Sequence, residues 1–167
     1  MMSKRARQYL GLASAILAYY LLHEGAHLVY ALVLGVFKQI NFMGLGVQID
    51  VFAEQMSSTQ LGWFCLWGSI CTAVAAYTLV LLTGKITKSK SKPLKACLFY
   101  ITIALLLLDP LYLSALCGLF GGGDMNGISL LIPELWARMI YGALLIINAI
   151  LFLKVVLPKY QESFKEK

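Results

Sequence analysis

Long apolar runs alternate along the chain with short polar segments. Four runs cover residues 8–37, 61–83, 94–120 and 132–157, and each is long enough to cross a bilayer as a helix, which needs about 20 apolar residues. The first run follows basic residues, as in a signal peptide, but it is too long for a signal-peptide core. We therefore expect a retained span and an all-α integral membrane protein with about four transmembrane helices, forming one domain over residues 1–167.

The segment between the first two runs has a different period. Apolar side chains alternate there with polar ones, at Val47, Ile49 and Val51, and Gly44 and Gly46 precede them. A period of two is typical of a strand, and the glycines favour a hairpin or a bent strand. Because a lipid-exposed strand would leave backbone groups unpaired, we expect this strand to pack on protein or to reach an aqueous face.

The third run is interrupted by residues that disfavour a helix. Asp109 and Pro110 lie deep inside it, and proline removes a backbone donor and disfavours helix just before it. Three glycines, residues 121–123, then precede Asp124. Broken helices at membrane depth usually border a cavity or a site.

The cations lie mostly outside the apolar runs. The chain is 60% hydrophobic and 13% charged, with a net charge of +6, which is too apolar for an ordinary soluble domain. Eleven of the 14 basic residues form three groups, before the first run, between the second and third, and after the fourth: Lys4, Arg5 and Arg7; Lys85, Lys88, Lys90, Lys92 and Lys95; Lys159, Lys165 and Lys167. Because basic loops stay cytoplasmic, we expect cytoplasmic termini, with membrane lipid rather than nucleic acid as a partner.

Three titratable side chains lie in the middle of the first run, where ionisable groups are costly. His23 and His27 are four residues apart, so a helix presents both imidazoles on one face, as a tetrahedral metal ion requires. Glu24 lies at the edge of that face and can reach a metal-bound water without being a ligand. This arrangement is the H-E-x-x-H pattern of zinc hydrolases, with two ligands and a general base. The alternatives are a polar helix–helix contact and a non-catalytic metal site.

A catalytic zinc ion needs a third protein ligand. Five of the eight carboxylates lie in the tail, near the strand or near the start of the fourth run: Glu162, Glu166, Asp50, Glu54 and Glu134. Besides Glu24, the proposed base, Asp109 and Asp124 remain, both in apolar surroundings. We favour Asp124 because the preceding glycines can turn it inward. Asp124 could also N-cap a helix beginning at Met125, which would not exclude binding a metal. Asp109 stays the alternative third ligand, because a straight third helix would place Asp124 at a different depth in the membrane from His23.

These motifs, in order over about residues 10–150, resemble the site-2 protease family of intramembrane zinc metalloproteases. "HEGAH" matches the H-E-x-x-H of that family, "MGLGVQIDV" resembles its membrane-associated sheet, and "DPLYLSALCGLFGGGD" resembles its late ligand motif. The chain departs from the family where Gly68 is followed by Ser69 rather than proline, and where Asp109 replaces an asparagine. The resemblance implies zinc ligands His23, His27 and Asp124, the base Glu24, and a cavity lined by Asp109.

We therefore expect a zinc-dependent endopeptidase, with one Zn²⁺ per chain, that cleaves a transmembrane or membrane-associated peptide. The edge of the strand Val47–Val51 would hold the unwound substrate by strand addition, with Asp109 and Asn126 on the polar side. Asn148 better suits a helix-packing hydrogen bond. The alternatives are a non-proteolytic scaffold or transporter subunit whose His-Glu-His cluster binds metal or protons, and a metal-independent assembly factor. The short chain with simple loops favours a prokaryotic plasma membrane.

Overall fold

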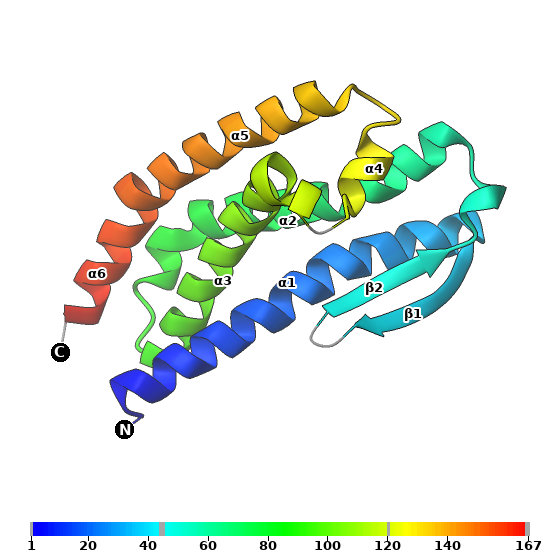
Figure 1. Cartoon of the computed structure of the whole chain (residues 1–167). Helices are drawn as coiled ribbons and strands as arrows, with labels where there is room; N and C mark the ends of the chain where they lie inside the picture. Colours follow the sequence, from blue (N-terminus) through cyan, green and yellow to red (C-terminus); the bar gives the residue numbers. More distant parts are fainter. Residues whose placement is uncertain (1, 44–45, 120, 166–167) are drawn as a thin grey trace.

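The computed structural model describes residues 2–43, 46–119 and 121–165, and most of them are helical (Figure 1). The helices and strands occur in the following order: α1 Lys4–Leu34, β1 Phe37–Met43, β2 Gly46–Val51, α2 Ser58–Ile86, α3 Lys92–Leu111, α4 Asp124–Ile128, α5 Glu134–Leu151 and α6 Leu157–Lys165. The four long helices lie side by side, the hairpin lies along the second half of α1, and both termini lie at the same end of the bundle.

Four helical stretches are long and apolar enough to cross a membrane: Lys4–Leu34, Ser58–Ile86, Lys92–Leu119 and Glu134–Lys165. Large apolar side chains are exposed along them, among them Ile16, Val74, Leu108 and Ile147. This arrangement confirms the predicted fold class of four such helices with a small sheet after the first. The first helix ends earlier than residue 37, because Gly35 adopts a left-handed conformation (φ 69°) and its N–H bonds to the carbonyls of the last turn.

The two strands form an antiparallel hairpin that packs on α1. Ile40 of β1 pairs with Ile49 of β2, and Ile49 is buried while Val47 and Val51 are half-buried. The predicted strand is therefore the second of a pair, and β1 supplies the backbone partners that it needs within an apolar environment. Gly44, which the sequence placed at the bend, lies outside the described residues.

Pro110 does not break the third span. α3 passes through Pro110 to Leu111, and a π-helical turn (Tyr112–Leu116) and a 3₁₀ turn (Cys117–Leu119) extend it. Proline has no N–H for the carbonyl of Leu106, four residues before it. Asn148 of α5 donates its Nδ2–H to that carbonyl at 2.7 Å, and its Oδ1 accepts from the hydroxyl of Tyr77 at 2.7 Å. Asn148 thus makes the expected helix-packing hydrogen bonds and satisfies the group that Pro110 leaves free.

Candidate metal centre

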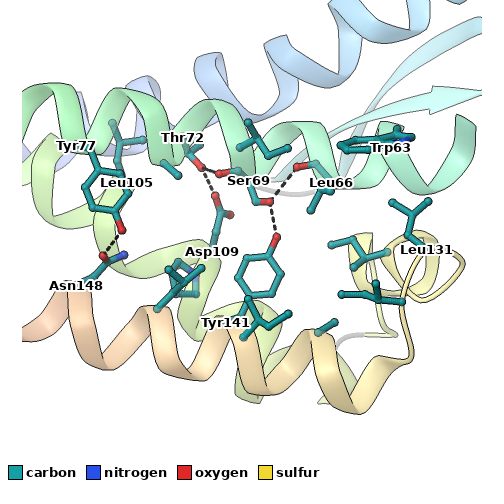
Figure 2. A pocket seen from close by; sticks show the side chains of 18 residues that line it. Trp63, Leu66, Ser69, Thr72, Tyr77, Leu105, Asp109, Leu131, Tyr141 and Asn148 are labelled. Atoms are coloured by element: carbon teal, nitrogen blue, oxygen red, sulfur yellow. Dashed lines mark hydrogen bonds between the residues drawn. The ribbon is translucent and has the colours of Figure 1, made fainter. Parts of the chain in front are cut away.

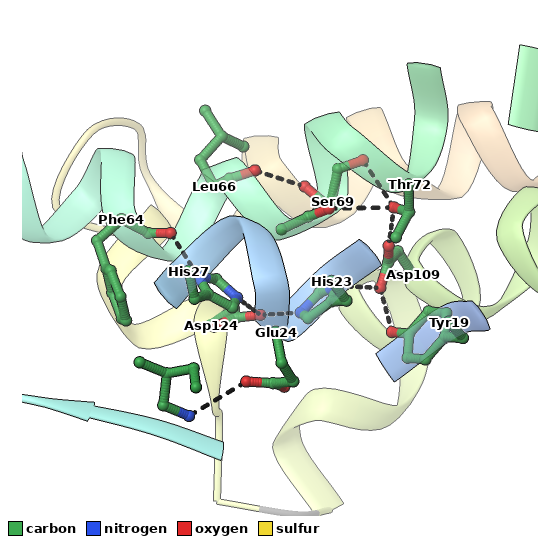
Figure 3. Close-up of polar contacts among 12 residues, drawn as sticks. Tyr19, His23, Glu24, His27, Phe64, Leu66, Ser69, Thr72, Asp109 and Asp124 are labelled. Atoms are coloured by element: carbon green, nitrogen blue, oxygen red, sulfur yellow. Dashed lines mark hydrogen bonds and ion pairs between the residues drawn. The ribbon is translucent and has the colours of Figure 1, made fainter. Parts of the chain in front are cut away.

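His23 and His27 of α1 meet Asp124 of α4 in the interior of the bundle (Figure 3). Asp124 Oδ2 lies 2.9 Å from His23 Nε2 and 3.5 Å from His27 Nε2. One ligand atom from each residue lies within 4.8 Å of the other two. The two imidazoles are 6% and 3% exposed, and Asp124 is half-buried. Two imidazole nitrogens and one carboxylate oxygen are a donor set that suits zinc.

The chain reverses at the three glycines before Asp124. Gly121, Gly122 and Gly123 have φ values of 80°, 88° and 48°, which side-chain-bearing residues rarely adopt. Asp124 is the first residue of the short helix α4, with Gly123 as its N-cap, so the alternative in which Asp124 caps a helix from Met125 is wrong. Because of this reversal, Asp124 returns to the depth of His23 even though it follows the end of the third span.

The second nitrogen of each imidazole faces an acceptor. His27 Nδ1 donates to the carbonyl of Phe64 at 2.8 Å, which requires the proton of a neutral imidazole to sit on Nδ1. His23 Nδ1 lies 3.2 Å from the Asp109 carboxylate. Both rings therefore turn Nε2 toward Asp124, and outer partners of this kind usually orient histidines for a metal.

Asp109 lies behind His23, on the side opposite Asp124 (Figure 3). It is 2% exposed and accepts hydrogen bonds from the hydroxyls of Tyr19 and Thr72. This carboxylate contacts Nδ1 rather than Nε2, so it does not belong to the group of three potential ligands. The geometry suits Asp109 to orienting His23.

A second, apolar cavity lies on the far side of Asp109, between α2, α3 and α5 (Figure 2). Its volume is about 360 Å³, and Asp109 and Thr72 are among its few polar lining groups. Ser69 donates to the carbonyl of Leu66 at 2.9 Å, so Tyr141 donates to Ser69, at 2.7 Å. Sequence reasoning missed Tyr19, Thr72 and Tyr141. The signal available for Thr72 was a pair of hydroxyl residues three apart, Ser69 and Thr72, inside an apolar run.

Two further observations support the fit of a metal ion at this centre. His27 Nε2 is buried and has no hydrogen-bond partner among the described residues, which is costly unless another group occupies that position. Burial raises the pKa of the Asp124 carboxyl, but the neighbouring imidazoles of His23 and His27 outweigh this effect and hold the pKa below its usual range. The carboxylate is the form in which an aspartate binds a metal.

Gly68 of α2 faces both imidazoles without a side chain. A Cβ at this position would lie 2.6 Å from His27 Nε2 and 2.8 Å from His23 Nε2, closer than atoms in contact approach. The absence of a side chain at Gly68 therefore leaves the space beside the two Nε2 atoms. Sequence reasoning noted Gly68 through the family resemblance but did not assign it this role.

We expect Gly68→Ala to disturb the centre strongly. Because the methyl group must displace the imidazoles or the helix, stability should fall by about 1–3 kcal/mol, as in other overpacked interiors, and retained zinc should fall with it. Thermal unfolding in detergent and metal analysis measure the two effects. Gly84→Ala is the matched control on the same helix, because its Cβ would meet nothing within 4 Å. Equal behaviour of the two variants would contradict this role for Gly68.

Glu24 lines a cavity of about 550 Å³ together with the histidines, Asp124 and the edge of β2. Its Oε2 accepts a hydrogen bond from the Ile49 N–H at 3.2 Å. Of the predicted substrate-contacting residues, Val47, Ile49 and Asn126 line this cavity. Val51 packs in the hydrophobic core instead, and Asp109 lines the apolar cavity behind His23.

No protein-family model, curated protein or solved structure matches this chain. Its function therefore has to be inferred from the arrangement of His23, His27, Asp124 and Glu24 itself.

Proposed function

We propose that the chain is an intramembrane zinc-dependent endopeptidase of the site-2 protease type. One observation carries this proposal: two imidazole nitrogens and a carboxylate converge inside four membrane-length helices, and Glu24 lines the same cavity. A purely structural polar contact would not leave His27 Nε2 buried without a hydrogen bond, 3.5 Å from Asp124 Oδ2. A site that only stored metal would not need an additional carboxylate beside an open cavity.

The chemistry assigned to the residues is peptide hydrolysis. Zinc held by His23, His27 and Asp124 would supply Lewis-acid polarisation and lower the pKa of a bound water. Glu24 accepts a proton from the attacking water as its oxygen bonds to the peptide carbonyl carbon. Glu24 then gives that proton to the amide nitrogen as the C–N bond breaks, which leaves a carboxylic acid and an amine. Asp109 keeps His23 oriented through Nδ1 during these steps.

The substrate in this proposal is a transmembrane or membrane-associated peptide that binds in extended form. The Ile49 N–H points at Glu24 rather than at β1, so this edge of β2 faces the cavity. An unwound peptide would pair with the edge over Val47–Val51 by strand addition. Asn126, whose side chain donates to the carbonyl of Gly121 at 3.1 Å, supplies a polar group to the lining of the same cavity.

The same proposal includes an orientation. Both termini and the loop between α2 and α3 lie at one end of the bundle, and this end carries most of the basic residues (Figure 1). Basic segments stay in the cytoplasm, so we assign the termini to that side.

Removal and return of metal tests the proposal directly. The purified full chain should cleave a model transmembrane peptide in detergent or vesicles, lose that activity in a strong chelator, and regain it with one equivalent of Zn²⁺ but not Mg²⁺, which prefers oxygen ligands. Stoichiometric zinc without cleavage of any such peptide would favour a scaffold or transporter subunit that binds metal or protons. A chain without bound zinc would favour a metal-independent assembly factor.

A further inference from the structure

A separate basic pocket lies at the end of the bundle that carries both termini. It is formed by the first turns of α1, the first half of α3 and the end of α6, and its volume is about 600 Å³. Its lining residues are Lys4, Arg7, Gln8, Ala96, Phe99, Tyr100, Gln161, Phe164 and Lys165. It shares no residue with the cavity of the metal centre.

The pocket combines cations with an aromatic floor. Lys4, Arg7 and Lys165 are its only charged lining residues, and no carboxylate lines it within the described ranges. The aromatic residues that line it are Phe99 and Tyr100 of α3 and Phe164 of α6. Such a combination fits a ligand with an anionic head and a hydrocarbon body.

A buried lysine holds the wall of the pocket in place. Lys95 is 4% exposed, and its Nζ donates to the Ser163 carbonyl at 2.7 Å and lies 5.4 Å from the ring centroid of Phe164. The Phe99 ring also lies 5.0 Å from the Tyr160 ring. These contacts fix α6 against α3, so the pocket exists before a ligand arrives. Ligand binding therefore costs little conformational entropy of the protein.

The cations of the pocket differ from those at the other end of the molecule. Lys38 pairs with Asp50 at 3.1 Å and Arg138 with Glu134 at 2.7 Å. Neither Lys4, Arg7 nor Lys165 forms an ion pair with another described residue. Three like charges around one pocket repel one another, and an anion between them would relieve that repulsion.

We propose that this pocket binds one anionic phospholipid, with the phosphate among Lys4, Arg7 and Lys165 and the acyl chains against Phe99 and Tyr100. A phospholipid is favoured over free phosphate because the pocket lies at the end of membrane-length helices and its floor is aromatic. The bound lipid ties the start of α1, which carries the metal-binding histidines, to α6. This site is independent of the proposed proteolysis.

Native mass spectrometry of the full chain in detergent tests the site. Equimolar phosphatidylglycerol and phosphatidylcholine with the same acyl chains are added at constant low ionic strength. We expect the wild-type chain to retain phosphatidylglycerol in preference to phosphatidylcholine. Each of the substitutions K4Q, R7Q and K165Q should lower this preference about fivefold, because one basic residue near an anionic headgroup contributes about that factor. A large excess of inorganic phosphate should not displace the lipid.

The matched control removes the same charge from the same end of the molecule. R5Q, K88Q and K90Q together change three exposed cations that do not line the pocket, and lipid preference should persist. Three results would each overturn the proposal: an equal loss of lipid preference in both triple variants, equal retention of the two lipids by the wild-type chain, or displacement of the lipid by inorganic phosphate. If the pocket triple variant aggregates, K165Q alone, at an exposed position, should lower phosphatidylglycerol retention about fivefold, and unchanged retention would overturn the site.

Discussion

Glu24→Gln is expected to lower peptide cleavage by about 10²–10⁴-fold while the zinc content stays at one ion per chain. The substitution keeps the size of the side chain and its acceptor for the Ile49 N–H, but it removes the group that accepts the proton of water. Glu24 is not one of the three residues whose ligand atoms converge, so metal binding should not depend on it. Metal analysis and a cleavage assay on the same preparation measure both outcomes.

Glu54→Gln is the matched control for this substitution. Glu54 is an exposed carboxylate after β2 and does not line the cavity of the metal centre. Its variant should cleave peptide at the wild-type rate. Full activity in Glu24→Gln would remove the general base from the mechanism, and loss of zinc in the same variant would show that Glu24 is a ligand instead.

Asp124→Ala is expected to abolish stoichiometric zinc binding, and Asp109→Asn to weaken it by roughly 10–100-fold, as is typical of a partner that orients a ligand. The difference follows from position. Asp124 faces the Nε2 atoms of His23 and His27 at 2.9 and 3.5 Å, whereas Asp109 lies 3.2 Å from Nδ1 of His23. Isothermal titration of the metal-free variants with Zn²⁺ gives both affinities.

Asp50→Asn controls for the loss of a carboxylate near the same cavity. Asp50 lies next to Ile49 in β2 but pairs with Lys38, so its variant should bind zinc like the wild type. The opposite ranking, with zinc retained in Asp124→Ala and lost in Asp109→Asn, would make Asp109 the third ligand. The mechanism would then need a different arrangement of His23.

Local patterns in the sequence were sufficient for the spans, the strand and the pair of histidines. A long apolar run needs its own backbone hydrogen bonds in lipid, so it predicts a helix whatever surrounds it. The four-residue spacing of His23 and His27 places both rings on one helical face by geometry alone. Each of these features depends on neighbours within a turn or two of the chain, which is why periodicity reveals it.

The third member of the centre and its supporting contacts depended on how distant segments pack. Asp124 meets His23 across 101 positions of sequence, and only the reversal at Gly121–Gly123 makes that contact possible. Asp109 and Asp124 were both plausible by composition, because the sequence does not say which nitrogen of an imidazole a carboxylate will face. Two further features likewise arise from neighbouring helices. One is the hydrogen bond from Asn148 that satisfies the carbonyl left free where α3 continues through Pro110. The other is the space that Gly68 leaves beside both imidazole rings. Such contacts follow from the three-dimensional path of the chain, which local periodicity does not encode.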